Sequence, residues 1–204
     1  RSTLLPGAML AFRKLHPGIP FEVIDGRYDE LLAGLRRGEI DIMIGALRIP
    51  SPIEDIEQQP LFDDSVVIVA GRGHPLLARD ALSPADLAAY PWVVARSGTP
   101  IRTALEALLP EDRIRGAIVT SSVILLREIL GNSDYLGAQS RVQVLPEGES
   151  ASLGVVPLAL PDSMRPIGIT TRAGWEPTAA QRRFLELLRQ GAAAMDMRAP
   201  HNKP

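Results

Sequence analysis

Short apolar runs alternate with amphipathic helical stretches along nearly the whole chain, and this alternation limits the possible folds more than any other feature. One such run covers residues 40–46, which are nearly all apolar and are bounded by turn residues. A parallel strand covered on both faces has this pattern, whereas a strand with one face in water alternates apolar and polar residues. Repeated alternation of strand and helix indicates an α/β protein with parallel sheets.

The first 46 residues predict a helix, a strand, a second helix and a second strand. Apolar residues recur at helical spacing over 5–15, and residues 19–23 alternate as in a strand. Asp29 is a plausible N-cap for the second helix, and Gly38 lies just past its end. A parallel sheet normally opens on a strand, but this chain opens almost on a helix. We therefore expect the first strand of the sheet to be missing, before Arg1.

The rest of the chain continues the same alternation. Further strands are predicted at 65–70, 92–95, 114–119, 135–138, 153–160 and 166–172, helices beginning near Ser83, Thr99, Ser121 and Thr178, and a helical turn or two within 139–145. Two lobes joined by two crossing strands explain this order. The predicted division is 1–70 as lobe I, 71–166 as lobe II, 167–197 as a return to lobe I, and 198–204 as a tail.

Composition excludes several classes of protein. The formal net charge is −2 and no run of Lys or Arg is longer than two residues, so this chain does not hold DNA by charge alone. It contains no cysteine, which rules out disulfides and thiolate metal sites and agrees with a cytoplasmic location. No apolar run reaches the roughly 18 residues that span a membrane. The three histidines do not cluster, so neither a metal site nor a cofactor is predicted.

A series of short motifs, in order, resembles a known family. The motifs are Leu4-Leu5-Pro6-Gly7, Phe12-Arg13, His16-Pro17, Glu30-Leu31-Leu32, Gly38-Glu39-Ile40-Asp41, Pro60-Leu61, Val67-Ile68-Val69, His74-Pro75-Leu76, Asp86-Leu87-Ala88, Pro91-Trp92, Arg165-Pro166-Ile167-Gly168 and Phe184-Leu185-Glu186-Leu187-Leu188. Together they resemble the effector-binding domain of LysR-type transcriptional regulators. Ser133-Asp134, Leu136, Ser140 and Gln143, with residues 97–102, look most like the subgroup around the galactose-binding-protein regulator.

This resemblance implies a two-lobed type 2 periplasmic-binding-protein fold with two crossing hinge strands and a small-molecule effector, a sugar, sugar acid or aromatic acid, held between the lobes. It also implies a homodimer of sensing domains and a tetramer of the full-length protein. DNA would be bound only through a winged helix-turn-helix that this chain does not contain. No membrane contact is implied.

Hydroxyl residues at three helix starts are the main candidates for effector binding, because helix N-termini attract anions and polar groups. In the implied fold these helix starts face one cleft. The candidate residues are Ser2, Thr3, Gly45, Ala46, Ser97, Thr99, Pro100, Ile101, Arg102, Ser121, Ser122 and Gln139. Each has a simpler explanation as well. The hydroxyls can be helix caps, Arg102 can bind a neighbouring loop, Gly45 and Ala46 can serve a turn, and Gln139 can be solvent-exposed.

Two other functions share the predicted fold. A periplasmic solute-binding protein would have a signal peptide upstream, and an enzyme such as a deaminase or dehydratase would need an acid/base pair in the cleft. No such pair is recognisable among the scattered acidic residues, so no catalytic residue is predicted.

Overall fold

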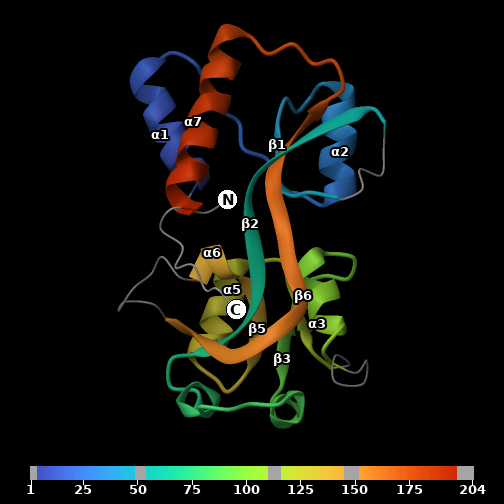
Figure 1. Ribbon diagram of the computed structural model, residues 1–204, viewed down its shortest axis with the longest axis vertical. Helices are drawn as coiled ribbons and strands as arrows, with labels where there is room; N and C mark the ends of the chain where they lie inside the picture. The colour runs from blue at the N-terminus through green and yellow to red at the C-terminus, as the bar shows by residue number, and fades with distance from the viewer. Residues whose placement is uncertain (1–3, 49–53, 110–115, 145–151, 197–204) are drawn as a thin grey trace. The chain divides into compact units, whose positions relative to one another are not determined.

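The chain forms two compact units and passes between them twice. The computed structural model describes residues 4–48, 54–109, 116–144 and 152–196. Unit 1 comprises Arg1–Asp63 and Arg165–Pro204, and unit 2 comprises Asp64–Met164. The chain passes from one unit to the other within strand β2 (Ile56–Gly71) and returns within strand β6 (Leu153–Arg172), as Figure 1 shows. The predicted pair of crossing strands is therefore confirmed. Both strands belong to one sheet of order β1-β6-β2-β5-β3-β4.

Unit 1 is built around two helices from opposite ends of the chain. Its elements are α1 (Leu4–Leu15), α2 (Tyr28–Arg37), β1 (Met43–Ala46), parts of β2 and β6, and α7 (Ala179–Asp196). Helix α1 packs against α7. The rings of Phe12, Phe21 and Phe184 meet at centroid distances of 5.0–5.7 Å. Such tilted and edge-on pairs add to the stabilisation from apolar burial, so α1, α7 and the segment after α1 share one core.

The ends of the unit 1 helices follow local capping rules. The predicted capping box of α7 is confirmed, since Gln181 N–H donates to Thr178 Oγ1 at 3.3 Å and Thr178 N–H donates to Gln181 Oε1 at 2.8 Å. Gly38 ends α2 with φ of 78°, as predicted. The prediction of Asp29 as the N-cap of α2 is wrong. Arg27 precedes the helix instead, and the Asp29 carboxylate accepts from the Arg27 guanidinium at 3.0 Å.

Unit 2 is an α/β unit with short connections. Its remaining elements are η1 (Pro75–Ala78), η2 (Pro84–Ala89), β3 (Trp92–Val94), α3 (Pro100–Glu106), β4 (Ile118–Val119), α5 (Val123–Gly131), β5 (Leu136–Ser140) and α6 (Arg141–Val144). Strand β3 pairs in parallel with β4 and with β5. Trp92 and Val94 of β3 pack in a core with Leu105 of α3, whereas Val93 packs in a core with Leu126 of α5. The sheet of unit 2 is therefore covered on both faces, as the apolar runs predict.

Unit 1 departs from the predicted parallel sheet in two places. Strand β1 pairs antiparallel with β6, and its residues are half-buried rather than buried on both faces. No strand forms at 19–23, where the alternation predicts one. Alternating apolar and polar residues show that the side chains could point to two opposite faces, as in a strand. A strand forms only where a neighbouring strand can exchange backbone hydrogen bonds with it. Ile19 and Val23 are accordingly 38% and 52% exposed.

The crossing strands are longer than predicted. The two strands expected at 153–160 and 166–172 are one continuous strand, β6, and β2 begins nine residues before the expected Ser65. Proline at position 166 suggests a break, but it lies opposite Leu47, just beyond the end of β1, and its carbonyl accepts from Leu47 N–H at 2.9 Å, so β6 continues through it. The predicted strand at 114–119 shortens to β4; its first two residues and the predicted tail at 198–204 lie outside the described residues. In the described part of the chain, no helix combines the length and apolar character that crossing a bilayer requires.

Asp86 gives a test of local structure in unit 2. Its carboxylate accepts from Ser83 N–H at 2.8 Å and from Arg79 Nη1 at 2.6 Å, at the start of η2. The hydrogen bonds from Ser83 and, to a smaller extent, the one from Arg79 together lower the pKa of Asp86 from 3.8 to about 2. Because the folded-state pKa is depressed, the ionised carboxylate stabilises the fold fully above about pH 4, and this contribution is lost as the pH falls toward 2.

We therefore expect Asp86→Asn to lower the free energy of unfolding at neutral pH and to lose this deficit between about pH 4 and 2. Urea unfolding of both proteins across this pH range measures the difference. Glu57→Gln, a neutralisation in unit 1, serves as a control for the loss of one charge. A deficit that stays constant down to pH 2 would contradict the assigned hydrogen bonds.

Candidate functional site

The carboxyl ends of three parallel strands meet at one edge of the sheet in unit 2. Val94 at the end of β3 pairs with Val119 at the end of β4, and Thr120 N–H continues the ladder to Val94 O at 3.0 Å. On the other side of β3, Val93 pairs with Gly137 of β5. The loops after these strands therefore start from the same edge. In open α/β sheets, ligands bind outside the carboxyl ends of the strands.

The loop after β3 carries the candidate residues 97–102. Ser97 and Gly98 are exposed, and Gly98 has a φ of 78°, which lets the chain turn into α3. Thr99 caps α3: its hydroxyl accepts from Arg102 N–H at 3.3 Å and donates to Arg96 O at 2.9 Å. Pro100 and Ile101 form the first turn and are half-buried.

Arg102 is held by its own unit. Its Nε donates to Glu106 Oε1 at 2.7 Å, and its Nη1 donates to Ala95 O at 3.4 Å, which ties α3 to the loop after β3. Its side chain is only 13% exposed. The alternative that Arg102 binds a neighbouring loop thus describes its contacts, and the exposed Glu106 is its ion-pair partner.

Arg96 lies in the same loop and was not among the residues singled out from sequence. It is exposed, and its guanidinium forms no hydrogen bond or ion pair with any residue that the structure describes. Its position directly after a strand is the signal that identifies it, because residues that follow parallel strands face the ligand edge. It is a cation at this edge that could pair with an acid without first breaking an internal ion pair.

The start of α5 supplies two hydroxyls with different roles. Ser122 caps the helix, since its Oγ accepts from Leu125 N–H at 3.2 Å. Ser121 is exposed, and its side chain makes no hydrogen bond with the described residues. Ser122 N–H in turn donates to Thr120 Oγ1 at 3.0 Å. Of the two candidates, Ser121 thus has the hydroxyl that is available to a ligand.

Gln139 lies in β5 opposite Val67 and is 9% exposed, so the simpler expectation that it faces solvent is wrong. The following residue, Ser140, is also buried. Nearby, the buried Asp64 of β2 accepts from Val142 N–H at 3.3 Å, at the start of α6. Asp64 and Ser140 were not predicted as parts of this region, because sequence does not show that a carboxylate near a strand crossing is buried.

The remaining candidates lie elsewhere. Gly45 and Ala46 belong to β1 of unit 1, and a Cβ added at Gly45 would meet no atom within 4 Å. Ser2 and Thr3 lie outside the described residues. The structure therefore gathers 97–102, 121–122 and 139 around one edge of unit 2. Within the described part of the chain, no group of three or more His, Cys, Asp or Glu is arranged to hold a metal ion.

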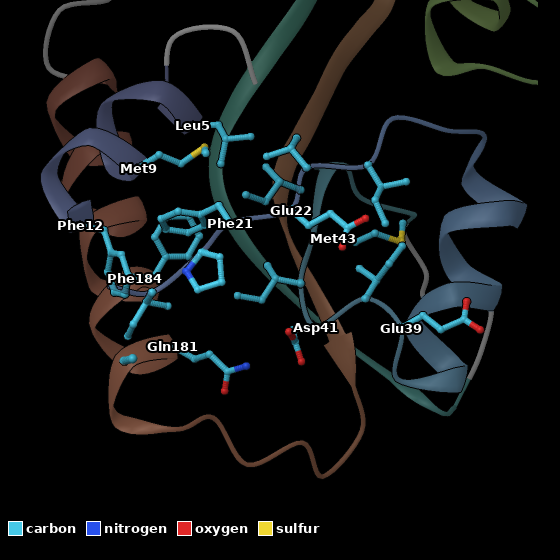
Figure 2. Close-up of a pocket in the computed structure, with 18 of the residues that line it drawn as sticks. Leu5, Met9, Phe12, Phe21, Glu22, Glu39, Asp41, Met43, Gln181 and Phe184 are labelled. Atoms are coloured by element: carbon cyan, nitrogen blue, oxygen red, sulfur yellow. The ribbon is translucent and has the colours of Figure 1, made fainter. Parts of the chain in front are cut away.

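A cavity of about 750 Å³ lies in unit 1 and includes none of the predicted site residues. Its walls come from α1, α7 and the residues on either side of α2, as Figure 2 shows. Leu5, Met9 and Phe12 approach it from α1, and Phe184 from α7.

Comparison with known proteins assigns this arrangement to a class. The regulatory domain of CcmR from Synechocystis PCC6803, solved in complex with 2-PG, superimposes with a TM-score of 0.75 over 94% of this chain and 92% of that one, at 19% identity. The effector-binding domain of QuiR, in complex with shikimate, gives a TM-score of 0.71 over 93% and 90%, also at 19% identity. The chain thus has the periplasmic-binding-protein-like fold of LysR regulatory domains, as the sequence predicts.

The family follows from sequence. The model of the LysR substrate binding domain matches residues 1–193, and the chain belongs to this family. The HTH-type transcriptional regulator GalR of Pseudomonas putida is 32% identical over 93% of this chain and 48% of its own length. The HTH-type transcriptional regulator PcaQ of Agrobacterium fabrum is 27% identical over 94% and 63%. The chain therefore spans about half to two thirds of these relatives.

The capping role of Ser122 can be separated from ligand binding. We expect Ser122→Ala to lower the free energy of unfolding by about 1 kcal/mol, because α5 loses its side-chain cap. Ser121→Ala is the matched control, since it removes a neighbouring hydroxyl that caps nothing. Urea denaturation compares the two variants, and equal stability of both would refute the assigned cap.

Proposed function

We propose that this chain is the sensing domain of a bacterial LysR-type transcriptional regulator, and that its effector binds at the carboxyl edge of β3, β4 and β5. The observation that carries the proposal is the convergence of loops 95–99 and 120–122 on this edge, in a chain of this family. Ser121, Ser97 and Arg96 are polar residues there whose side chains have no internal partner among the described residues. Contact of the effector with Gly45 and Ala46 stays a prediction.

The chemistry of the edge favours an oxygen-rich small molecule. Ser121 can donate to or accept from a hydroxyl, the N-terminal amides of α5 can donate to an oxygen, and Arg96 can pair with a carboxylate in two-pronged fashion. Sugars, sugar acids and aromatic acids have these groups. CcmR and QuiR, with 2-PG and shikimate, are relatives in fold that bind small organic molecules.

Effector binding would act by shifting an equilibrium between two arrangements of the protein. A ligand changes such an equilibrium only by its difference in affinity for the two states, typically 1–3 kcal/mol of coupling. The chain passes between the units only within β2 and β6, so these strands would absorb the change. The DNA-binding partner would be a winged helix-turn-helix elsewhere in the full-length protein, which would act in the cytoplasm without catalysis.

A thermal-shift screen of sugars, sugar acids and aromatic acids tests the effector site. A compound that binds the folded protein raises Tm by mass action. We expect Ser121→Trp to abolish the shift with Tm of the free protein unchanged, because the indole fills the edge. Arg96→Gln should weaken the response to acids but not to neutral sugars.

Ala89→Trp is the matched control for this screen. Ala89 is exposed and lies just before β3, at the opposite end of the strand from the proposed site. This variant should respond as the unmodified protein does. A full response of Ser121→Trp to every compound that shifts the parent protein would overturn the proposed position of the effector.

We further propose that the domain forms a homodimer, which would assemble into tetramers in the full-length protein. Several large apolar side chains of β4 and the first turn of α5 are exposed: Ile118, Val119, Val123, Ile124 and Leu125, with Ile124 at 75%. Exposed apolar side chains on these two elements, in a protein of this family, support a contact with a second copy.

Ile124→Glu tests the dimer. The carboxylate would be buried without a partner in a dimer contact, so we expect a shift toward monomer of at least tenfold in dissociation constant. Light scattering after size exclusion reports the mass. Met164→Glu, at another exposed apolar residue, is the control and should leave the mass unchanged. Equal masses for Ile124→Glu and the parent dimer would exclude this face.

The alternative of a periplasmic solute-binding protein has no support among the relatives. GalR and PcaQ are both named as transcriptional regulators, and their similarity to this chain covers more than nine tenths of it.

A further inference from the structure

Gln139 of β5 is a buried polar side chain without a hydrogen-bond partner in the part of the chain that the structure describes. It is 9% exposed, and its amide forms no hydrogen bond with any described residue. Most buried polar side chains are hydrogen-bonded, because an unpaired polar group in the interior destabilises the fold. The amide of Gln139 therefore indicates a partner from outside the chain, either a ligand or a water molecule.

The neighbours of Gln139 place it at the proposed effector site. A Cβ added at Gly137, two residues earlier in β5, would lie 3.4 Å from Leu126 Cδ1 of α5. Because side chains alternate along a strand, Gln139 is on this same face. Only four residues join α5 to β5, so the two elements run in opposite directions and the end of β5 lies beside the first turn of α5. Gln139 is therefore next to the helix start that follows Ser121.

The amide of Gln139 is buried but not sealed in the core. Tyr28 Oη in unit 1 is a fully enclosed side-chain atom that lacks a hydrogen bond, whereas neither amide atom of Gln139 is enclosed in this way. A ligand at the carboxyl edge of the sheet can therefore reach the amide without the core opening. A partly covered polar group of this kind contributes more to selectivity than an exposed one, because water replaces a missing ligand group less readily there.

The amide is selective for a ligand group that both donates and accepts. Its NH2 has two donors, and its carbonyl oxygen is an acceptor. A carboxylate only accepts, so it would leave the carbonyl oxygen of Gln139 unpaired. A hydroxyl can pair with either half of the amide, and two adjacent hydroxyls can pair with both halves. Since a site with buried polar groups rejects ligands that leave these groups unpaired, Gln139 favours a ligand with hydroxyl groups.

Two charged residues of unit 2 give such a ligand an orientation. Asp64 is buried close to the end of β5, where its carboxylate accepts from Val142 N–H at 3.3 Å. A second carboxylate placed there would be repelled, whereas a hydroxyl would not. Arg96 is exposed in the loop after β3 and can pair with an acid. A ligand with its hydroxyls at Gln139 and its carboxylate at Arg96 satisfies both requirements.

We propose that the effector is an organic acid with adjacent hydroxyl groups, and that Gln139 selects it by binding the hydroxyls while Arg96 pairs with the carboxylate. The proposal rests on the effector site proposed above. It narrows the ligand class from sugars, sugar acids and aromatic acids in general to those acids that are also hydroxylated. Neutral sugars lack the charge that Arg96 pairs with, and unsubstituted aromatic acids lack the hydroxyls that the amide needs.

Matched compounds test the ligand class. Each series contains a hydroxylated acid, the acid without hydroxyls and a neutral compound with the hydroxyls. Gluconate, hexanoate and glucose form one series, and a dihydroxybenzoate, benzoate and catechol form another. We expect a hydroxylated acid to raise Tm and to bind about tenfold or more tightly than both of its counterparts. The proposal is overturned if no hydroxylated acid raises Tm, or if hexanoate or benzoate raises it as much.

Gln139→Leu tests the selecting residue. Leucine leaves no polar group unpaired, so the free energy of unfolding should not fall. We expect the hydroxylated acid to bind about tenfold more weakly and its hydroxyl-free counterpart to bind as before, so that the preference is lost. Gln190→Leu, the same change at an exposed position of α7, is the control and should keep the preference. Isothermal titration calorimetry measures each Kd. An unchanged preference in Gln139→Leu would mean that water satisfies the amide, and it would refute the proposal.

Two variants together separate a wrong ligand class from a wrong site. If Ser121→Trp abolishes binding but Gln139→Leu keeps the preference for hydroxylated acids, the effector binds at this edge and Gln139 does not select it. If Ser121→Trp binds every compound as the parent protein does, the effector site itself is placed wrongly. Loss of binding in Ser121→Trp together with loss of the preference in Gln139→Leu supports both proposals.

Discussion

The close contact between β6 and β2 is the constraint on which the rest of the structure depends, because these two strands are where the chain passes between the units. At Gly168, a Cβ would lie 2.2 Å from the carbonyl oxygen of Gln59, so the backbones approach more closely than any side chain permits. Gly168 also pairs with Gly45 of β1. Three strands of unit 1 thus meet at Gly168, where a side chain would clash with β2. The next residue of β6, Ile169, belongs to the core formed by α1 and α7.

In unit 2, the residues that stabilise the proposed site differ from the residues that are available to a ligand. Thr99, Ser122 and Arg102 bind their own helices and loops, which fixes the shape of the carboxyl edge. Ser121 and Arg96 remain accessible on that fixed edge. Rigid supporting hydrogen bonds with a few available polar groups are what selective binding needs, since a ligand then loses little free energy in ordering the protein.

Patterns in the sequence predict elements whose partners are close along the chain or whose helices have strong caps. The capping pair of Thr178 and Gln181, the left-handed Gly38 and the parallel sheet of unit 2 are cases in which local chemistry decides the structure. The antiparallel pairing of β1 with β6 joins residues more than 120 positions apart, and no local pattern encodes it. The same distinction holds at the proposed site. The helix caps can be predicted from sequence, but the burial of Gln139 and the ion pair of Arg102 depend on tertiary packing.

The pairing of α1 with α7 also affects how the protein is made. Unit 2 is a continuous stretch of chain, whereas unit 1 needs residues from both ends. During synthesis the first helix leaves the ribosome more than 160 residues before the helix that covers its apolar face. Contacts so distant in sequence form slowly, and apolar surface that waits for its partner is prone to aggregate. Unit 2 can therefore fold while unit 1 is still incomplete, and cellular yield should depend on how long Leu4, Ala8 and Phe12 stay uncovered.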